Sequence, residues 1–222
     1  MAAAKRASGA KGAKGAKRPK VSIVIRTYNE IRHLPDLFRA IRSQKTPGLD
    51  VEIVLVDSGS TDGTLEVAKV NGAKEVFISR EEFSFGRSLN YGCAAATGDA
   101  LVFISGHCIP MDEGWLANLA RPVLEGKVAY AYGKQRGGGN TKYSEHQLFK
   151  KYFPEESKVP QEGFFCNNAN SCLSKAVWRQ HPFDEQVTGL EDMELARRLV
   201  DRGMKIGYVA DAGVFHLHDE TW

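Results

Sequence analysis

One loop rich in small polar residues places a carboxylate where it could bind a ligand. Residues 56–64 read VDSGSTDGT, and Asp57 comes directly after a β-branched run. A carboxylate at the end of a buried strand can accept a hydrogen bond from a base imide or a ribose hydroxyl. Thr61 or Asp62 could cap the helix that follows, but capping does not account for Asp57. Asp57 is therefore a candidate nucleotide-binding residue.

A second polar segment, RTYNE at residues 26–30, also follows a β-branched run. Thr27, Tyr28 and Asn29 supply hydroxyl, aromatic and amide groups, which can hold a nucleobase by stacking and hydrogen bonding. The alternative is that Asn29 only caps the next helix. With Asp57, this segment indicates a nucleotide site.

Two acidic residues, Glu191 and Asp192, stand at the start of a predicted helix. The helix dipole and the free N–H groups of the first turn keep a carboxylate ionised there. Such a carboxylate can act as a general base. Acidic residues also occupy this position for charge complementarity alone, so the chemical role is a hypothesis.

Three histidines are candidate metal ligands. His107 ends the segment Ser-Gly-His, and His216 and His218 alternate in VFHLHDE, so a strand there would project both to one face. Imidazole binds Mn²⁺ and related cations. The alternative is that these are ordinary exposed or hydrogen-bonded side chains. We expect His107 and one of the other two, preferably His216, to be ligands.

Alternating strands and helices must position these groups. Short β-branched runs alternate with amphipathic stretches up to residue 124, which predicts an α/β fold with a parallel sheet. The predicted strands are 21–26, 51–56, 74–78 and 100–104, and the predicted helices are 31–44, 63–71, 86–96 and 113–124. The carboxyl ends of such strands line one crevice, so residues 27–30, 57–64 and 105–110 should share a rim.

The second half of the chain is less regular. The glycine run 137–139 predicts a mobile loop. A helix over 190–202 is clearer, because its apolar residues share a face and Gly203 supplies a C-terminal stop. Two short apolar runs, 205–209 and 213–217, follow it. The abrupt end after His218 suggests a truncated domain.

Composition separates a basic tail from a mildly acidic body. The chain has 222 residues, and seven of its 30 Lys and Arg lie in the first 20, which contain no acid. Residues 1–20 are predicted to be a disordered tail, either simply solvated or in contact with anionic membrane lipid or nucleic acid. The remainder carries 23 basic against 27 acidic residues, about −4, so no nucleic acid partner is expected.

The cysteines and apolar runs bear on the compartment. The four cysteines form no CxxC pair, which argues against a zinc knuckle or a disulfide framework. No apolar run is long enough to span a bilayer. We expect a cytoplasmic protein, in contact with the inner face of the membrane if the tail binds lipid.

In order and spacing these motifs resemble the family 2 glycosyltransferases of the GT-A fold. YN at a strand end, VDSGSTDGT about 30 residues later, FGRSLNYGCAAATGDALVFIS at 85–105 and GLEDMELARRL at 189–199 carry the resemblance. It covers the chain from residue 21 onward. It implies a single GT-A domain over residues 21–222, with a Rossmann-like, mostly parallel sheet flanked by helices.

The resemblance also implies roles for particular residues. Its nucleotide-sugar site would contain Thr27, Tyr28, Asn29, Asp57, Arg87, Asn90, Ser105 and Asn168, with Arg87 and Asn90 facing the pyrophosphate. Asp192 would be the catalytic base, and Glu191 would orient the acceptor or the loop. The family's Asp-x-Asp is replaced here by Ser-Gly-His, which puts ribose contact and metal affinity in doubt. His107 would then stand in as a ligand for Mn²⁺ or Mg²⁺.

The implied activity is inverting transfer of a hexosyl or deoxyhexosyl group to an acceptor hydroxyl. UDP and dTDP donors are favoured, the acceptor would be a glycan or a lipid-linked molecule, and the HxH ending is similar to rhamnosyltransferase-like members. The setting would be surface polysaccharide or glycoconjugate synthesis. The alternatives are a GT-A sugar-nucleotide-binding protein with weak or no activity, and a nucleotidyltransferase. The latter usually has a glycine-rich basic loop after the first strand, which RTYNE lacks.

Overall fold

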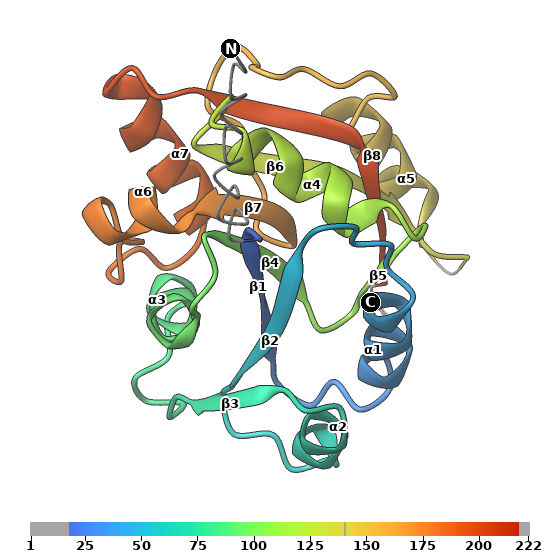
Figure 1. The fold of residues 1–222 in the computed structure, drawn as a ribbon. Helices are drawn as coiled ribbons and strands as arrows, with labels where there is room; N and C mark the ends of the chain where they lie inside the picture. The colour runs from blue at the N-terminus through green and yellow to red at the C-terminus, as the bar shows by residue number, and fades with distance from the viewer. Residues whose placement is uncertain (1–17, 140, 218–222) are drawn as a thin grey trace, which may run out of the picture.

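An eight-stranded sheet with helices on both faces organises the chain (Figure 1). The computed structural model describes residues 18–139 and 141–217. The strand order is β3-β2-β1-β4-β7-β6-β8-β5. The strands are β1 Lys20–Thr27, β2 Asp50–Asp57, β3 Lys74–Phe77, β4 Ala100–Ser105, β5 Cys108–Pro110, β6 Tyr130–Gly137, β7 Asn170–Ser174 and β8 Ile206–His216. The helices are α1 Leu34–Arg42, α2 Thr64–Val70, α3 Phe85–Ala95, α4 Trp115–Leu124, α5 Tyr143–Tyr152, α6 Lys175–Gln180 and α7 Glu191–Asp201.

The first four predicted strands form the parallel half of the sheet. β1 pairs in parallel with β2 and β4, and β2 pairs in parallel with β3. The register sets Thr27 beside Asp57 and Arg26 beside Ser105. The carboxyl ends of these strands therefore meet at one edge, and the predictions of an α/β fold and a shared rim are confirmed.

The second half of the sheet differs from its sequence-based description. β7 pairs antiparallel with β4 and β6, and β5 pairs antiparallel with β8. The two predicted runs 205–209 and 213–217 are one strand, because β8 pairs with β6 on both sides of an irregularity between Gly133 and Gln135. Gly137, expected in a mobile loop, is the last residue of β6 and pairs with His216. Strands β5, β6 and β7 and helices α5 and α6 were not predicted.

Alternation along β1 divides the core between the two faces of the sheet. Val21, Ile23 and Ile25 belong to the cluster that packs against α1 and α4, whereas Val24 belongs to the cluster on the α3 and α7 side. Arg26 has the same parity as Val24, so it faces α3 and α7. On that side α3 comes very close to β1, because a Cβ on its Gly92 would lie 2.4 Å from Val24 Cγ1.

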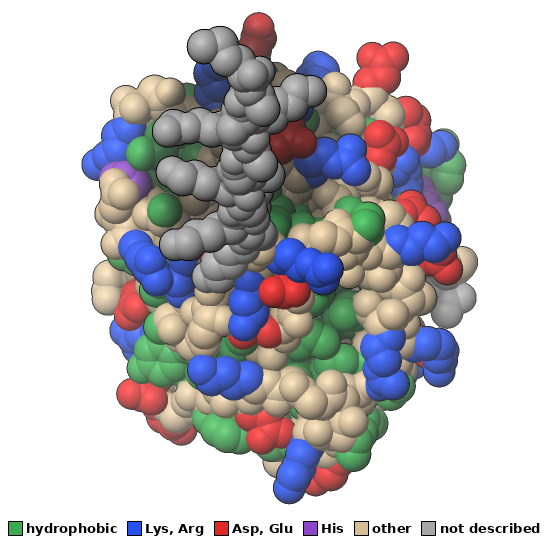
Figure 2. Space-filling model, viewed as in Figure 1, with side chains coloured by type: hydrophobic (Ala, Val, Ile, Leu, Met, Phe, Trp, Pro, Cys, Tyr) green, Lys and Arg blue, Asp and Glu red, His purple; other side chains and the backbone are tan. Residues whose placement is uncertain are grey.

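On the face seen in Figure 2, Lys and Arg side chains are interspersed with Asp and Glu rather than gathered by sign. All four cysteines are free and buried. Within the described ranges, none of the helices has the length and apolarity needed to cross a bilayer. Most of the predicted basic tail, residues 1–17, lies outside the described residues, as does His218.

Glu52 of β2 ties together the starts of three strands. Its carboxylate accepts hydrogen bonds from the Ser22 hydroxyl at 2.5 Å and from the Thr97 amide at 2.5 Å, and it pairs with Lys20 Nζ at 2.6 Å. Lys20, assigned from sequence to the disordered tail, is thereby the first residue of β1. Burial raises the pKa of Glu52, but the donors from Lys20, Ser22 and Thr97 outweigh it and lower the pKa to about 2.

We predict that Glu52→Gln destabilises the protein in a pH-dependent way. The folded-state pKa lies below the usual 4.5, so the ionised carboxylate stabilises the fold above about pH 4.5, and this contribution is lost as the pH falls toward 2. The substitution should lower the free energy of unfolding at pH 7 by about 1–3 kcal/mol. Urea unfolding at pH 7 and pH 3.5 measures this, and a gap that does not narrow at pH 3.5 contradicts it.

Candidate functional site

The turn after β1 is joined to the loop after β2 by hydrogen bonds. Asn29, at a positive φ of 54°, accepts the Thr61 N–H at 2.9 Å through its side-chain oxygen, and its own N–H donates to the Ser60 hydroxyl at 2.8 Å. Asn29 is not a helix cap, since the N-cap of α1 is His33. The polar loops predicted to bind a nucleotide therefore form one surface.

The buried carboxylate of Asp57 stabilises this surface through hydrogen bonds. It is 1% exposed, and its Oδ1 accepts the N–H groups of Gly59 and Ser60, both at 2.9 Å. Its Oδ2 accepts the hydroxyls of Ser60 at 2.5 Å and Thr27 at 3.2 Å. A carboxylate has about four acceptor directions, and protein groups use all four. Contact with a base therefore needs a hydroxyl to turn, and Thr27 can do so because the Val56 carbonyl also lies within reach at 3.3 Å.

Tyr28 and Arg80 form an exposed platform on the same surface. Tyr28 is 44% exposed, the Arg80 guanidinium lies 4.5 Å from the centre of its ring, and Arg80 also donates to the Tyr28 hydroxyl. A planar cation stacked on a ring restricts the ring and adds a positive charge beside it. Arg80 was not recognised in the sequence, because it follows β3 with no motif around it.

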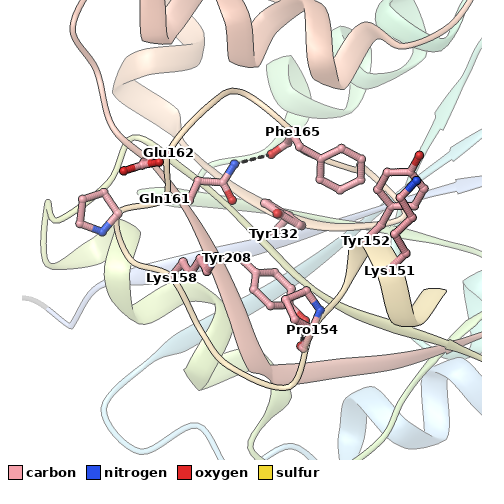
Figure 3. Close-up of a pocket in the computed structure, with 10 residues that line it drawn as sticks. Tyr132, Lys151, Tyr152, Pro154, Lys158, Gln161, Glu162, Phe165 and Tyr208 are labelled. Atoms are coloured by element: carbon pink, nitrogen blue, oxygen red, sulfur yellow. Dashed lines mark hydrogen bonds between the residues drawn. The ribbon is translucent and has the colours of Figure 1, made fainter. Parts of the chain in front are cut away.

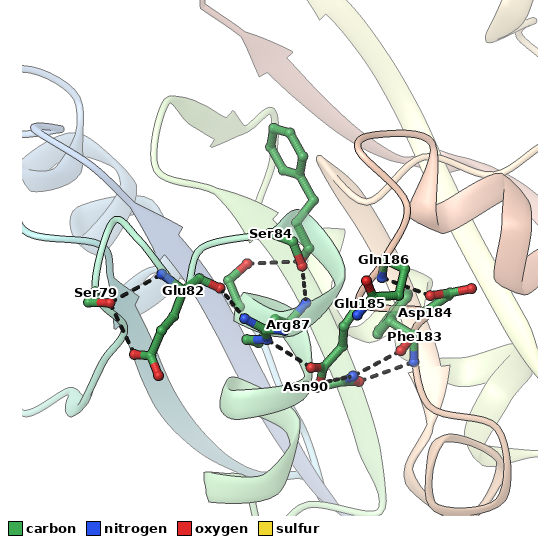
Figure 4. Close-up of polar contacts among 11 residues, drawn as sticks. Ser79, Glu82, Ser84, Arg87, Asn90, Phe183, Asp184, Glu185 and Gln186 are labelled. Carbon is green, nitrogen blue, oxygen red and sulfur yellow. Dashed lines mark hydrogen bonds and ion pairs between the residues drawn. The ribbon is translucent and has the colours of Figure 1, made fainter.

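Arg87 and Asn90, predicted to face a pyrophosphate, hold two parts of the chain together (Figure 4). Arg87 Nε pairs with Glu185 at 2.8 Å, and its Nη1 donates to the Glu82 carbonyl at 2.7 Å. The Asn90 amide donates to the Phe183 carbonyl and to Glu185, both at 2.9 Å, and its oxygen accepts the Trp178 indole N–H at 3.0 Å. These contacts dock α3 against residues 183–185, and the phosphate role stays a prediction.

His107 and His216, far apart in sequence, face each other at the end of the sheet. Their Nε2 atoms lie 3.1 Å apart and their ring planes are within 15° of parallel. His107 Nδ1 lies 2.7 Å from Glu30 Oε1, and His216 Nδ1 lies 2.9 Å from Gln135 Oε1. Sequence analysis found both histidines but neither of their partners.

The hydrogen-bond network determines which ring nitrogen of His216 carries the proton. The Ala169 N–H donates to Asn167 Oδ1 at 3.0 Å, which identifies that atom as oxygen. The Gln135 amide nitrogen donates to the same oxygen at 2.8 Å, so Gln135 turns its own oxygen toward His216. That oxygen can only accept, and His216 Nδ1 must therefore donate. Since the Glu30 carboxylate also accepts, both neutral imidazoles direct an Nε2 lone pair toward the other.

Two Nε2 lone pairs only 3.1 Å apart suit a cation that lies to one side of both nitrogens, because metal–imidazole distances are about 2.0–2.1 Å. Metal-ligating histidines commonly donate their other N–H to a carboxylate or carbonyl oxygen, as both do here, so the residues present fit a divalent cation. Residues 18–139 and 141–217 include no cluster of three His, Cys, Asp or Glu side chains able to hold a metal by themselves. Further ligands would have to come from a bound molecule or from outside the described residues, where His218 lies. Ser105, expected near the ribose, is the last residue of β4, two positions before His107.

Asp192 and Glu191 begin α7 as a buried carboxylate pair. They are 7% and 5% exposed. Asp192 Oδ2 accepts the Asn168 N–H at 3.0 Å, and its Oδ1 accepts the Met193 N–H at 2.7 Å. Burial and the neighbouring Glu191 raise the pKa of Asp192 above its usual value, against the opposing effect of these N–H groups and of Arg26. The result is an oriented carboxylate with increased basicity, as a general base requires.

Adjacent asparagines join the carboxylates to the histidines. Asn168 is 2% exposed and donates to Glu191 Oε1 at 3.3 Å, and its oxygen accepts the Tyr130 hydroxyl. Asn167 Oδ1 accepts a hydrogen bond from the Gln135 amide, and the Gln135 oxygen in turn accepts one from His216 Nδ1. Asn168, predicted as a donor ligand, thus has its polar groups committed to positioning the carboxylates.

An aromatic cavity of about 640 Å³ opens on the side of the sheet where α7 and Asp192 lie (Figure 3). Tyr132, Tyr152, Phe165 and Tyr208 line it, with Lys151 and Lys158 among its polar groups. Tyr132 is two residues along β6 from Tyr130, or about 7 Å. Phe165 is three residues before Asn168, so their Cα atoms lie within about 11 Å. The cavity therefore lies near the Asn168 contact with Asp192.

Known proteins resemble the chain in sequence and in fold. The family model described as Glycosyl transferase family 2 matches residues 22–180. The O-antigen chain rhamnosyltransferase RfbN of Salmonella typhimurium is 26% identical over 215 residues, which cover 91% of this chain and 68% of RfbN.

Two crystal structures illustrate the shared fold. Staphylococcus aureus TarS 1–349 in complex with UDP-GlcNAc has a TM-score of 0.71 at 18% identity, covering 91% of this chain and 60% of that one. Mannosyltransferase PcManGT from Pyrobaculum calidifontis, in complex with GDP-Man and Mn²⁺, has a TM-score of 0.66 at 19% identity, covering 90% and 57%. The chain therefore spans less than two thirds of each of these two structures.

We predict that His107 and His216 are both Nδ1–H tautomers when neutral, because Glu30 and Gln135 each present an acceptor to Nδ1. Long-range ¹H–¹⁵N spectra of the imidazoles identify the protonated nitrogen directly. Gln135→Met should release the tautomer of His216 and leave that of His107 unchanged, which provides an internal control. An Nε2–H tautomer at both residues of the unsubstituted protein would overturn the assignment.

Proposed function

The chain belongs to glycosyl transferase family 2, and we propose that it transfers a hexosyl or deoxyhexosyl group from a nucleoside diphosphate donor to an acceptor hydroxyl, with inversion. One observation carries the proposal. The adjacent Asn167 and Asn168 link a buried, oriented carboxylate, Asp192, to a pair of histidines suited to a cation. Base and cation are the two groups that such a transfer needs.

The donor would lie on the surface formed by the turn after β1 and the loop after β2. Tyr28, stacked on Arg80, offers a face for the base, and the Thr27 hydroxyl can turn from Asp57 toward it. The two compared structures hold different nucleotides, one UDP-GlcNAc and the other GDP-Man. Our preference for UDP or dTDP rests on the motif resemblance, with Arg87, Asn90 and Ser105 nearer the phosphates and ribose.

His107 and His216 are the proposed protein ligands of a divalent cation, Mn²⁺ or Mg²⁺, in a Ser-Gly-His variant of the family's Asp-x-Asp. When bound, the cation would supply positive charge to the departing diphosphate. Glu30 and Gln135 would orient the imidazoles and keep their lone pairs on Nε2. His218 could add a further ligand.

Asp192 would take the proton from the acceptor hydroxyl as that oxygen attacks the anomeric carbon. The N–H groups of Asn168 and Met193 keep its carboxylate in one orientation. Attack opposite the leaving diphosphate inverts the anomeric centre. Glu191, held by the Asn168 amide, would orient the acceptor or the base.

The aromatic cavity beside Asn168 is the proposed acceptor site. Its rings offer faces for a glycan, and Lys151 and Lys158 could pair with the phosphate of a lipid-linked acceptor. RfbN is named for O-antigen chain synthesis. A role in surface polysaccharide or glycoconjugate synthesis, at the inner face of the membrane, follows for this chain as a proposal, with the basic tail as a contact to anionic lipid.

Donor turnover with and without metal tests this function. We expect hydrolysis or transfer from at least one of a panel of UDP-, dTDP- and GDP-sugars in Mn²⁺ or Mg²⁺, and its loss in chelator. Asp192→Asn should lower turnover by about 10²–10⁴-fold, because the base is removed, and leave donor affinity by calorimetry unchanged. Undiminished turnover in Asp192→Asn contradicts the role of Asp192.

Controls in the same assay separate the alternatives. His216→Ala should weaken Mn²⁺ binding, read by electron paramagnetic resonance, whereas His181→Ala at the end of α6 should not. Donor binding without turnover under any metal would favour the binding-protein alternative, to which the absence of Asp-x-Asp points. Release of diphosphate from a nucleoside triphosphate would instead favour a nucleotidyltransferase.

Tyr152 tests the acceptor site. It is 44% exposed and stacks on Phe165 at 5.4 Å, so Tyr152→Ala removes part of the cavity wall at the surface. We expect the KM for the acceptor to rise about tenfold or more and the donor KM to stay constant. Tyr143→Ala, at the other end of α5 and 79% exposed, is the matched control. Equal effects of the two substitutions would exclude the cavity.

A further inference from the structure

Arg26 extends from the central strand of the sheet to the carboxylate pair. It lies one residue before the end of β1, and its parity with Val24 turns it toward α3 and α7. Its Nη1 lies 3.6 Å from Glu191 Oε1. The exposed fraction of its side chain is 18%. Arg26 is the first residue of the RTYNE segment, but the sequence assigns it no role because its carboxylate partner lies 165 residues away.

The surroundings of Arg26 make its charge effective over several ångströms. Nη1 is buried and forms no hydrogen bond with any of the described residues. The guanidinium lies 5.1 Å from the centre of the Phe85 ring, which packs beside it. Burial lowers the pKa of Arg26, and Glu191 and Asp192 oppose that effect. A guanidinium stays protonated in proteins, so this site keeps a fixed positive charge at low effective dielectric.

Charge balance around Asp192 requires such a cation. Two adjacent carboxylates buried together cannot both stay ionised without compensation. The other titratable groups that face Asp192 are the Tyr130 hydroxyl on β6 and the Cys166 thiol before β7, and both are neutral because burial raises their pKa. Among the described groups around this pair, Arg26 is the positive one.

We infer that Arg26 is a positioning residue that keeps Asp192 ionised beside the buried Glu191, so that Asp192 is ready to act as a base near neutral pH. The inference rests on the proposed function for its catalytic consequence. Arg26 acts through the carboxylates, since its Nη1 is directed at Glu191 and shielded from solvent. Its effect should therefore appear in the titration of Asp192 and be absent from donor affinity.

Carboxyl titration by ¹³C NMR tests the inference without any substrate. In Arg26→Gln the pKa of Asp192 should rise by about 1 unit, because a buried positive charge that lowers it has been removed. Arg26→Lys retains the positive charge, so the pKa of Asp192 in this variant should stay close to its value in the unsubstituted protein. Arg197→Gln is the matched control on α7, since that side chain is 68% exposed and pairs with Asp201. It should leave the titration unchanged.

The pH profile of kcat provides the second readout. In Arg26→Gln the acidic limb of the profile should move to higher pH by the same amount as the pKa of Asp192. Below that pKa, kcat should fall about tenfold for each unit of the shift. The UDP affinity measured by calorimetry should stay constant. An unmoved Asp192 pKa overturns the inference, and a loss of UDP binding at every pH would make Arg26 a ligand instead. If neither the unsubstituted protein nor the variants transfer sugar, the proposed function fails, and the NMR titration still decides the role of Arg26.

A second pair of variants tests the inference if Arg26→Gln does not fold. Arg26→Gln with Glu191→Gln removes the cation and its 3.6 Å partner together, so it leaves less unpaired buried charge than the single substitution. The reference for it is Glu191→Gln alone. A higher Asp192 pKa in the double variant supports the inference, and equal values overturn it.

Discussion

The hydrogen bonds of Asn167 and Asn168 are the constraint on which the site depends. These adjacent residues precede β7 and are placed between β6 and α7, so their peptide and amide groups reach both. Asn168 supplies the N–H that orients Asp192, and Asn167 supplies the oxygen that orients Gln135 and, through it, His216. Buried polar groups must be paired, so each bond restricts the next one. The proposed base Asp192 on α7 and the proposed ligand His216 on β8 are thus held in one arrangement.

Electrostatics adds a second constraint to this arrangement. A base must be ionised to accept a proton, yet burial of two adjacent carboxylates opposes ionisation. The N–H groups at the start of α7 and the Arg26 guanidinium both act against that penalty. The buried position of Arg26 Nη1 lowers the effective dielectric there, which strengthens the attraction between the charges. The same low dielectric that opposes ionisation of the carboxylates therefore also strengthens the effect of a single buried cation on them.

The two halves of the sheet contribute different parts. The parallel half ends in the loops that present Tyr28, Arg80 and Asp57, because parallel strands bring their carboxyl ends to one edge. The second half, in which β6 and β8 are parallel and the other pairs are antiparallel, brings the chain back, and β8 runs long enough to carry His216 to that edge beside His107. The register irregularity between Gly133 and Gln135 places Gln135 where it meets His216. The proposed donor surface and the proposed catalytic groups therefore come from separate stretches of sequence.

Local pattern in the sequence was enough to determine the parallel half, the helices that flank it, and the candidates Asp57, His107, His216, Glu191 and Asp192, because periodicity, loop composition and helix ends are local properties. It failed for β6, β7 and α5, whose residues lack a clear period. Arg26, Glu30, Arg80, Gln135 and Asn167 carry no local signal of their contacts, since their importance comes from partners 32 to 165 residues away. Only the tertiary structure could decide their roles, because a hydrogen bond or a charge acts through distance in space and is indifferent to distance along the chain.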